Sequence, residues 1–306
     1  MSRHALADLR DPVRALCAKF DSAYWQRVTA EPGGGYPTEF VKALTEGGWL
    51  AALIPTEFGG GGLGVTEASV ILEEINRSGG NSGACHAQLY IMGTLLRHGS
   101  AAQKKLWLPQ IASGALRLQS FAVTEPTTGT DTTSTKTVAE RRGDRYVVNG
   151  QKVWISRVRH SDLMLLLART SPARDGAKKS DGLSIFLVDL RDSTTRGLTI
   201  RPIANMVNHE TSELFFDDFE VPAENLIGKE GEGFRYILDG MNAERILIAA
   251  ECVGDGYWFT EKSRTYASER SVFGREIGRN QGVQFPIARA YANVRAADLM
   301  RFEAAR

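Results

Sequence analysis

The chain has 306 residues, enough for two or three domains with a sizeable buried core. Its 37 basic and 36 acidic residues nearly cancel, so no net charge is available to hold a nucleic acid or an anionic membrane surface. Three scattered cysteines argue against a disulfide framework or a zinc site and favour a reducing, cytoplasmic compartment. The start, MSRHALADLRDPVR, lacks the apolar core of a signal peptide, and no apolar run reaches membrane-spanning length.

Residues 1–117 are predicted to form a helical domain, because apolar residues recur there at helical spacing. One continuous stripe comprises Val13, Cys17, Phe20, Tyr24 and Val28. Further along, Ser100 and Gln103 have the spacing of a capping box, which predicts the start of a helix at AAQKKLWL.

Residues 118–225 are predicted to form an all-β domain, because the pattern there changes to that of strands. The predicted strands include LMLLLART, LSIFLVDL, LTIRPI and ELFFDDFEVP. Within YVVNGQKVWIS, Asn149-Gly150 is typical of a two-residue β-hairpin turn, so a hairpin is predicted at that point.

Residues 226–306 return to a helical period and are predicted to form a C-terminal helical domain. One face carries Ile237, Gly240, Glu244, Ile248 and Glu251, and a later one carries Val283, Ile287, Tyr291, Val294 and Ala297. The sequence thus predicts an α+β fold with an N-terminal helical domain, a middle β-sheet or barrel domain and a C-terminal helical bundle. No Gly, Asn or Pro ends the last helix before Arg306, so we expect the bundle to be truncated.

Familiar catalytic motifs are absent from the sequence. No G-x-G-x-x-G or G-x-x-x-x-G-K follows a predicted strand, and neither H-E-x-x-H nor G-x-S-x-G occurs. The five histidines lie far apart in the chain, so no metal site is predicted.

The stretch FAVTEPTTGTD, residues 121–131, combines small hydroxyl side chains with a glycine, and Trp154 and Ser156 lie further along. A flat conjugated ring such as a flavin would find here an aromatic face, hydrogen-bond donors and close backbone approach. Taken singly, each of these residues is better explained by an ordinary turn or by core packing.

Together with FFDDFEVP, GKEGEGF and ERSVFGREIGRNQGVQF, these segments resemble the acyl-CoA dehydrogenase family over nearly the whole chain. The resemblance implies an FAD-dependent oxidoreductase that converts an acyl-CoA thioester to the trans-2-enoyl-CoA. It also implies that electrons pass to an electron-transferring flavoprotein, and that the subunits form a homotetramer or homodimer.

The resemblance assigns site residues to three groups. Those near the flavin ring are Phe121, Val123, Thr124, Gly129, Thr130, Trp154, Ile155 and Ser156. Those toward the adenine dinucleotide half of FAD, reached partly across a subunit contact, are Arg270, Phe273 and Gln281. Those expected to contact the acyl-CoA are Thr130, Asn242 and Arg245.

Glu244 is the expected catalytic base, because it immediately precedes an Arg on the helix after the β domain. This position resembles the base of isovaleryl-CoA and long-chain acyl-CoA dehydrogenases; in most members the base is a Glu further along, here beyond Arg306. Gly240 is expected to leave room for an acyl chain and Ile248 to supply an apolar wall. Glu251, on the same face, is expected to tolerate substitution.

The sequence departs from the family pattern at three places and leaves two functional alternatives open. Thr130 replaces the commoner Ser, Ser156 replaces the commoner Thr, and Arg157-Val158 stands where Asn-Gly is usual. The alternatives are a flavin oxidase or monooxygenase on the same fold, and a non-catalytic relative that binds acyl-CoA or a partner protein. Acyl chain length and branching stay open.

Overall fold

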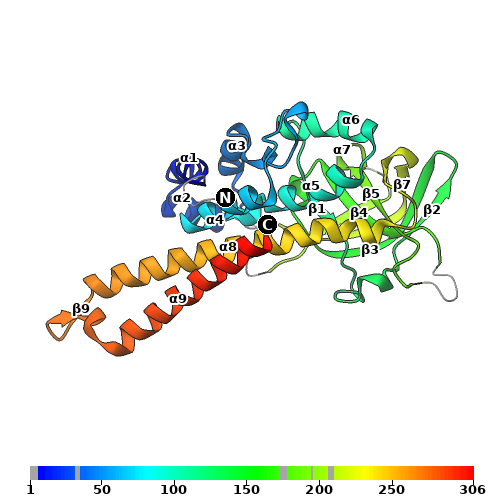
Figure 1. The fold of residues 1–306 in the computed structure, drawn as a ribbon. Helices are drawn as coiled ribbons and strands as arrows, with labels where there is room; N and C mark the ends of the chain where they lie inside the picture. The colour runs from blue at the N-terminus through cyan, green and yellow to red at the C-terminus, as the bar shows by residue number, and fades with distance from the viewer. Residues whose placement is uncertain (1–5, 32–34, 173–177, 194–195, 206–209) are drawn as a thin grey trace. The chain divides into compact units, whose positions relative to one another are not determined.

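The computed structural model describes residues 6–31, 35–172, 178–193, 196–205 and 210–306. It confirms the α+β class, with helices first, a β-sheet in the middle and helices again at the end (Figure 1). By their internal contacts the residues divide into two compact units. One unit comprises Arg27–Gly62 and Gly83–Glu244, and the other comprises Met1–Gln26, Leu63–Ser82 and Arg245–Arg306.

The unit that holds the sheet also contains three helices from the N-terminal part of the chain. These are α3 (Thr38–Glu46), α5 (His86–His98) and α6 (Ala101–Ala112). The predicted capping box begins α6, since the Gln103 backbone N–H donates to Ser100 Oγ at 3.1 Å and the Ser100 N–H donates to Gln103 Oε1 at 2.9 Å. Short 3-10 turns lie at Trp49–Ala51, Thr56–Phe58 and Ser82–Ala84.

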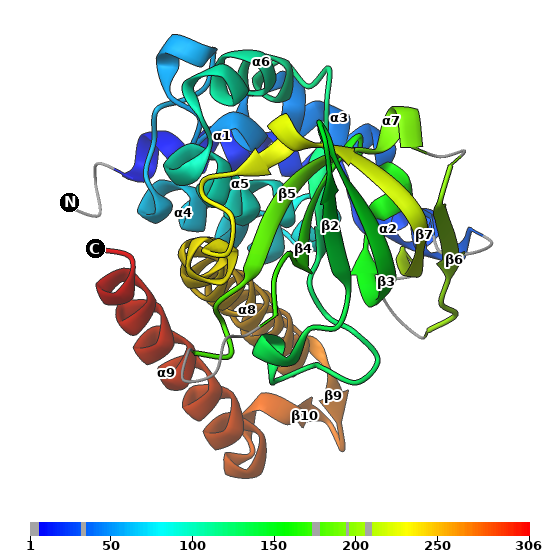
Figure 2. The ribbon, with the colours of Figure 1, turned by 90° about the vertical axis from the view of Figure 1, so that its right-hand side faces the viewer.

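The mixed sheet follows the predicted strand pattern closely, and Figure 2 shows its strands side by side. The strands are β1 (Leu118–Ala122), β2 (Val138–Arg142), β3 (Arg145–Ser156), β4 (Leu163–Arg169), β5 (Leu183–Asp189), β6 (Leu198–Pro202), β7 (Thr211–Pro222) and β8 (Leu226–Ile227). Their order is β6-β7-β3-β2-β4-β5-β8, and β1 pairs in parallel with β4. The shorter elements are η5 (Thr132–Ser134), η6 (Val158–His160), α7 (Leu190–Ser193) and η7 (Ala223–Asn225).

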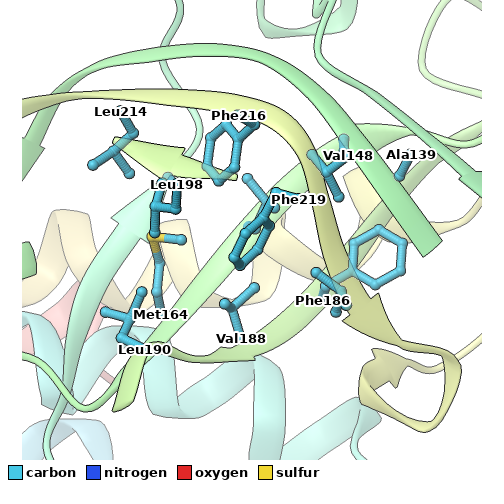
Figure 3. Packing of buried hydrophobic residues seen from close by; sticks show 14 of the residues in the cluster. Ala139, Val148, Met164, Phe186, Val188, Leu190, Leu198, Leu214, Phe216 and Phe219 are labelled. Carbon is cyan, nitrogen blue, oxygen red and sulfur yellow. The ribbon is translucent and has the colours of Figure 1, made fainter. Parts of the chain in front are cut away.

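The core of the β domain is built from buried apolar side chains that several strands of the sheet contribute. Figure 3 shows Phe186 and Val188 of β5 close to Phe216 and Phe219 of β7, with Met164 of β4 beside them. These side chains are at most 4% exposed, so the sheet is a rigid support for the loops at its edge.

The predicted hairpin at Asn149-Gly150 is wrong, because β3 runs unbroken through both residues. The actual β2–β3 turn lies at Gly143, whose φ is 64°. At Gly150 the pairing with β7 shifts register, and a Cβ there would lie 2.6 Å from Thr137 Oγ1. The Asn149 side chain exchanges two hydrogen bonds with Asp218 of β7. The Asn-Gly pair therefore forms an irregularity in a long strand, since pairing with β7 outweighs the local turn preference.

The second unit is helical, with a small two-stranded sheet. Its elements are α1 (Ala7–Cys17), α4 (Val65–Arg77), the part of α8 (Gly233–Glu269) from Arg245 onward, β9 (Ser271–Val272), β10 (Arg275–Glu276), η8 (Ile277–Arg279) and α9 (Gln281–Ala304). Figure 1 shows this part of α8 side by side with α9, and a Cβ on Gly256 of α8 would lie 2.6 Å from Val294 of α9.

The stripe predicted over residues 13–28 is divided between two helices, α1 and α2 (Ser22–Ala30). Cys17 ends α1, and Phe20 lies in the connection rather than on a helix. Val13, Cys17, Tyr24 and Val28 are nevertheless buried, so the apolar pattern was informative about burial but not about continuity.

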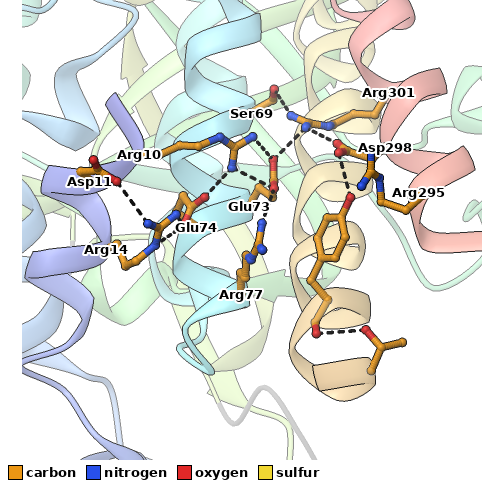
Figure 4. A network of polar contacts seen from close by, with 12 residues as sticks. Arg10, Asp11, Arg14, Ser69, Glu73, Glu74, Arg77, Arg295, Asp298 and Arg301 are labelled. Carbon is orange, nitrogen blue, oxygen red and sulfur yellow. Dashed lines mark hydrogen bonds and ion pairs between the residues drawn. The ribbon is translucent and has the colours of Figure 1, made fainter. Parts of the chain in front are cut away.

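Two buried carboxylates hold α1, α4 and α9 together in the helical unit (Figure 4). Glu73 and Glu74 of α4 each have only 1% of their side chain exposed. Glu73 accepts from Arg10 of α1 at 2.7 Å and from Arg301 of α9 at 2.8 Å, while Glu74 pairs with Arg10 and with Arg14 at 3.1 Å. Because each buried charge has an opposite charge beside it, removal of one partner is expected to be costly.

Among the described residues, no helix is both long and apolar enough to cross a membrane. Cys17 and Cys85 are buried and Cys252 is exposed, all as free thiols.

Candidate active site

The loop after β1 is fastened to β3 by a buried ion pair. Lys152 of β3 is fully buried, and its Nζ donates to Glu125 Oε1 and to the Val123 carbonyl, both at 2.9 Å. The Glu125 carboxylate also accepts from the backbone N–H of Lys136 at 2.8 Å and of Thr137 at 2.9 Å. Both ends of the loop, residues 123–137, are therefore anchored on one carboxylate.

The pKa values of the pair reflect its burial. Burial lowers the pKa of the Lys152 ammonium to about 8, and the charge of Glu125 only partly opposes this shift. Burial alone would raise the pKa of the Glu125 carboxyl, but the Lys152 charge and the hydrogen bonds from Thr137 and Lys136 outweigh it, so the pKa is lowered. Glu125 is thus an anion at neutral pH.

Trp154 stands in an unusual backbone conformation beside this loop. Its φ is 61°, it lies where the β3–β7 register shifts between Lys152 and Ile155, and 60% of its surface is exposed. A bulky residue with positive φ is strained, and a bulge turns a side chain away from its regular direction. The bulge brings Lys152 and Val153 into the interior and turns the indole of Trp154 outward. An exposed aromatic face held at such a cost is typical of a ligand-binding site.

The sequence-predicted flavin residues of this unit lie on two joined segments. The Val153 backbone N–H donates to the Thr124 carbonyl at 2.9 Å, which links the loop to the strand that carries Trp154 and Ser156. Thr124 and Ser156 are half-buried, as is Phe121. Val123 is buried, and the Ile155 side chain belongs to the β-domain core, so Ile155 has only backbone atoms to offer a ligand.

The loop has features that suit a planar ligand. Gly129 is exposed, and a Cβ at this position would meet no atom within 4 Å, which leaves open space above the backbone. Thr130 beside it is exposed. Thr128 is 5% exposed, yet its Oγ1 has no hydrogen-bond partner in the described part of the chain. A buried hydroxyl of this kind carries an unmet hydrogen-bonding capacity, so the residues present fit a bound flavin.

Helix α8 is held against α5 one turn before Glu244. A Cβ on Gly240 would lie 3.0 Å from Thr94 Oγ1 and 3.2 Å from the Tyr90 carbonyl, both on α5. Asp239 also pairs with His98 of α5 at 2.6 Å. Glu244 itself is half-buried. The close contact between the two helices therefore fixes the position of Glu244 relative to α5.

The reason predicted for Gly240 is wrong, because the residue permits contact between two helices and does not face open space. Ile248 is half-buried, which agrees with a role as an apolar wall of a pocket but agrees equally with ordinary helix packing. Glu251 is only 8% exposed, so it is not a surface residue at which a substitution would be expected to have no effect.

The remaining predicted site residues lie outside the sheet-containing unit or at its boundary. Asn242 is exposed in the same unit as Glu244, whereas Arg245, Arg270, Phe273 and Gln281 belong to the helical unit and are exposed. Phe273 is fully exposed with φ 51°, and with Gly274 it forms the two-residue turn between β9 and β10. Asn and Gly normally occupy such a turn, so an exposed phenylalanine there is a second strained aromatic.

Sequence reasoning missed Glu125, Lys152 and Arg157 as parts of the site. The signal for the pair was a lysine within the apolar strand KVWIS and a glutamate that begins the turn EPTTG. Only the structure shows that both side chains are buried and in contact. Arg157 is 5% exposed with φ 59°, and no sequence pattern predicts burial of an arginine there.

Family comparisons match all three parts of the chain. Residues 4–115 match the acyl-CoA dehydrogenase N-terminal domain, residues 120–219 the middle domain and residues 231–306 the C-terminal domain.

Similar proteins include two curated bacterial enzymes. The chain is 35% identical to cyclohex-1-ene-1-carbonyl-CoA dehydrogenase of Syntrophus aciditrophicus, over 87% of this chain and 63% of that protein. It is also 35% identical to glutaryl-CoA dehydrogenase of Desulfococcus multivorans, over 87% of this chain and 68% of that protein. The chain thus spans about two thirds of the length of these relatives.

Solved structures share the fold over the whole chain. The glutaryl-coenzyme A dehydrogenase complex with glutaryl-CoA aligns with a TM-score of 0.91 at 32% identity, and covers 100% of this chain and 76% of that one. A chain from the study of the electron transferring flavoprotein of Acidaminococcus fermentans aligns at 0.89 and 28% identity, over 100% of this chain and 79% of that one. PigA with FAD and proline aligns at 0.88 and 25% identity, over 99% and 78%. The protein belongs to the acyl-CoA dehydrogenase family.

Proposed function

We propose that this protein catalyses the FAD-dependent α,β-dehydrogenation of an acyl-CoA thioester to the trans-2-enoyl-CoA. The observation that carries the proposal is the strained, exposed Trp154 beside a fastened loop of threonines and an open glycine. The solved glutaryl-CoA complex of a similar protein supports an acyl-CoA substrate, and the structure of PigA with FAD supports the cofactor.

The chain's own residues would hold the flavin from two segments. Trp154 offers an aromatic face, Thr124 and Ser156 offer hydroxyl donors, and Gly129 allows the backbone to approach closely. The Glu125–Lys152 pair fastens the loop that carries Thr124 and Gly129 to the strand that carries Trp154 and Ser156. FAD, when bound, accepts the hydride that leaves the β-carbon of the substrate.

Glu244 is the proposed base, which accepts the proton from the α-carbon as the hydride leaves the β-carbon. A half-buried carboxylate on a helix braced against α5 can be held at one distance from a substrate. Arg245, Asn242 and Thr130 are proposed to contact the acyl-CoA.

Replacing Glu244 with glutamine tests the proposal, because the amide keeps size and hydrogen bonding but cannot accept the proton. We expect Glu244→Gln to retain its flavin and to bind acyl-CoA. Its rate of anaerobic flavin bleaching should fall by about 10²- to 10⁴-fold. Glu261→Gln, at an exposed position on the same helix, is the matched control and should bleach normally. Normal bleaching by Glu244→Gln would show that the base lies elsewhere, such as beyond Arg306.

We further propose that the reduced flavin delivers its electrons to an electron-transferring flavoprotein. The acceptor is supported by the fold shared with a chain studied alongside such a protein. The reduced enzyme should then react slowly with oxygen, and rapid stoichiometric release of hydrogen peroxide would identify an oxidase.

The adenine half of FAD is proposed to contact Arg270, Phe273 and Gln281 across a subunit contact within a homodimer or homotetramer. Arg270→Ala should then lower flavin content and shift the sedimentation coefficient together, whereas Arg279→Ala, at another exposed arginine nearby, should change neither. An unchanged flavin content and assembly in Arg270→Ala would contradict the assignment. A cytoplasmic location remains an expectation from the cysteine pattern.

A further inference from the structure

Arg157 is a buried arginine at the end of the strand that carries Trp154. It is 5% exposed and its φ is 59°, in the left-handed region. Its guanidinium reaches the segment that begins α5, where one terminal nitrogen donates to the Gly83 carbonyl and the other lies 3.2 Å from His86 Nε2. Arg157 therefore lies between the proposed flavin-flanking strand and the first turn of α5.

The charge of this guanidinium is not balanced within the described residues. A guanidinium has five N–H donors and no acceptor, and the two contacts to Gly83 and His86 use only part of them. Its Nε is buried and has no hydrogen-bond partner in the part of the chain that the structure describes. Glu210, whose carbonyl accepts the Arg157 backbone N–H at 2.6 Å, directs its carboxylate to Arg159 at 3.2 Å and His160 at 2.8 Å.

The surroundings add to the positive potential rather than reduce it. The N-terminus of α5, a 13-residue helix that begins at His86, carries partial positive charge. A buried cation without a counter-ion is costly, and so is a left-handed conformation for a long side chain. A purely structural tether to Gly83 could be made by a neutral side chain, and asparagine in particular tolerates this backbone. A role as a tether therefore does not account for the arginine.

We infer that Arg157 binds a carboxylate at the distal end of the acyl chain, so that the substrate is an acyl-CoA that ends in a carboxylate. The inference rests on the proposed function, because the resemblance to the acyl-CoA dehydrogenase family implies that residues 84–92, which include the first turns of α5, line the acyl pocket. An arginine pairs with a carboxylate through two parallel hydrogen bonds, which would use the unpartnered Nε and one terminal nitrogen. The reaction itself is unchanged, since the proton still leaves the α-carbon and the hydride the β-carbon.

The test compares two ligands that the oxidised flavoprotein cannot dehydrogenate further: glutaconyl-CoA, which ends in a carboxylate, and hex-2-enoyl-CoA, which does not. Dissociation constants are measured by calorimetry on the full chain with its flavin. The wild type should bind glutaconyl-CoA about 10- to 100-fold more tightly, as expected for a charge-assisted hydrogen-bonded pair. Arg157→Asn should remove the preference while affinity for hex-2-enoyl-CoA persists, and Arg157→Lys should keep part of it.

Two outcomes distinguish failure of the Arg157 inference from failure of the proposed dehydrogenase function. If hexanoyl-CoA and glutaryl-CoA bleach the flavin equally well and the wild type shows no preference in binding, the inference is overturned and the dehydrogenase proposal stands. If neither acyl-CoA bleaches the flavin, the proposed function fails. A preference that survives in Arg157→Asn also overturns the inference. Should Arg157→Asn fail to fold, as judged by circular dichroism, the wild-type preference and Arg157→Lys decide.

Discussion

Replacing Lys152 with methionine should loosen the flavin loop and destabilise the protein. The substitution leaves the Glu125 carboxylate, itself 5% exposed, without its charged partner and with only the backbone N–H groups of Lys136 and Thr137. Breaking a buried pair by removing one member costs about 3–5 kcal/mol. The double variant Glu125→Gln/Lys152→Met should recover part of this loss, because no charge then remains buried.

Urea unfolding followed by circular dichroism measures the free energy of unfolding, and flavin fluorescence measures FAD affinity in the same samples. Lys136→Met is the matched control, because its side chain is exposed although its backbone also donates to Glu125. The control should lie within about 0.5 kcal/mol of wild type. Equal stability and equal FAD affinity for Lys152→Met and Lys136→Met would refute the view that the ion pair holds the loop.

Three further results are expected. Trp154→Asn should raise the free energy of unfolding in urea by up to about 1 kcal/mol through relief of backbone strain, yet lower FAD affinity; unchanged affinity would remove Trp154 from the site. Gly129→Ala should be as stable as wild type but bind FAD less well. Gly240→Ala should lower the free energy of unfolding by about 1–3 kcal/mol, because its Cβ would press against α5; a larger loss in Gly129→Ala than in Gly240→Ala would contradict the packing described. Because the pKa of Glu125 is lowered in the folded protein, the unfolded state binds more protons in acid. The free energy of unfolding of wild type should therefore fall relative to that of Glu125→Gln as the pH drops below about 4.5. Parallel pH profiles of the two free energies would exclude this titration.

Hydrophobic patterning predicted the elements of this fold well wherever burial follows a regular period. The apolar runs of β4 and β5 needed no tertiary information, and the spacing of Ser100 and Gln103 predicted a helix start correctly. The stripe predicted along α9 does lie on a helix, but its side chains are half-buried or exposed, and the buried residues of α9 are Asp298 and Arg301. The error at Asn149-Gly150 arose because a turn signal is local, whereas the long pairing of β3 with β7 is not.

The candidate site was less accessible to sequence reasoning. Family resemblance pointed to Trp154, but the positive φ that turns its ring outward depends on a register shift between distant strands. The same shift buries Lys152, a residue type that is almost always placed at the surface. Arg157 was noted only as a departure from the family pattern, because its burial depends on contact with Gly83 and His86, more than 70 residues earlier in the chain.

The buried carboxylate of Glu73 has a consequence for the order in which the chain folds. It joins Arg10 near the start to Arg301 near the end, a sequence separation of 228 residues for the second contact. Contacts this distant close slowly because a long loop must be ordered first. On the ribosome, the helical unit lacks α9 until residues 281–304 have been made, whereas all segments of the sheet-containing unit have been made by Glu244. The β domain should therefore gain protection from hydrogen exchange before α1 and α4, and Glu73 has Arg10 but not Arg301 as a partner until α9 has been made.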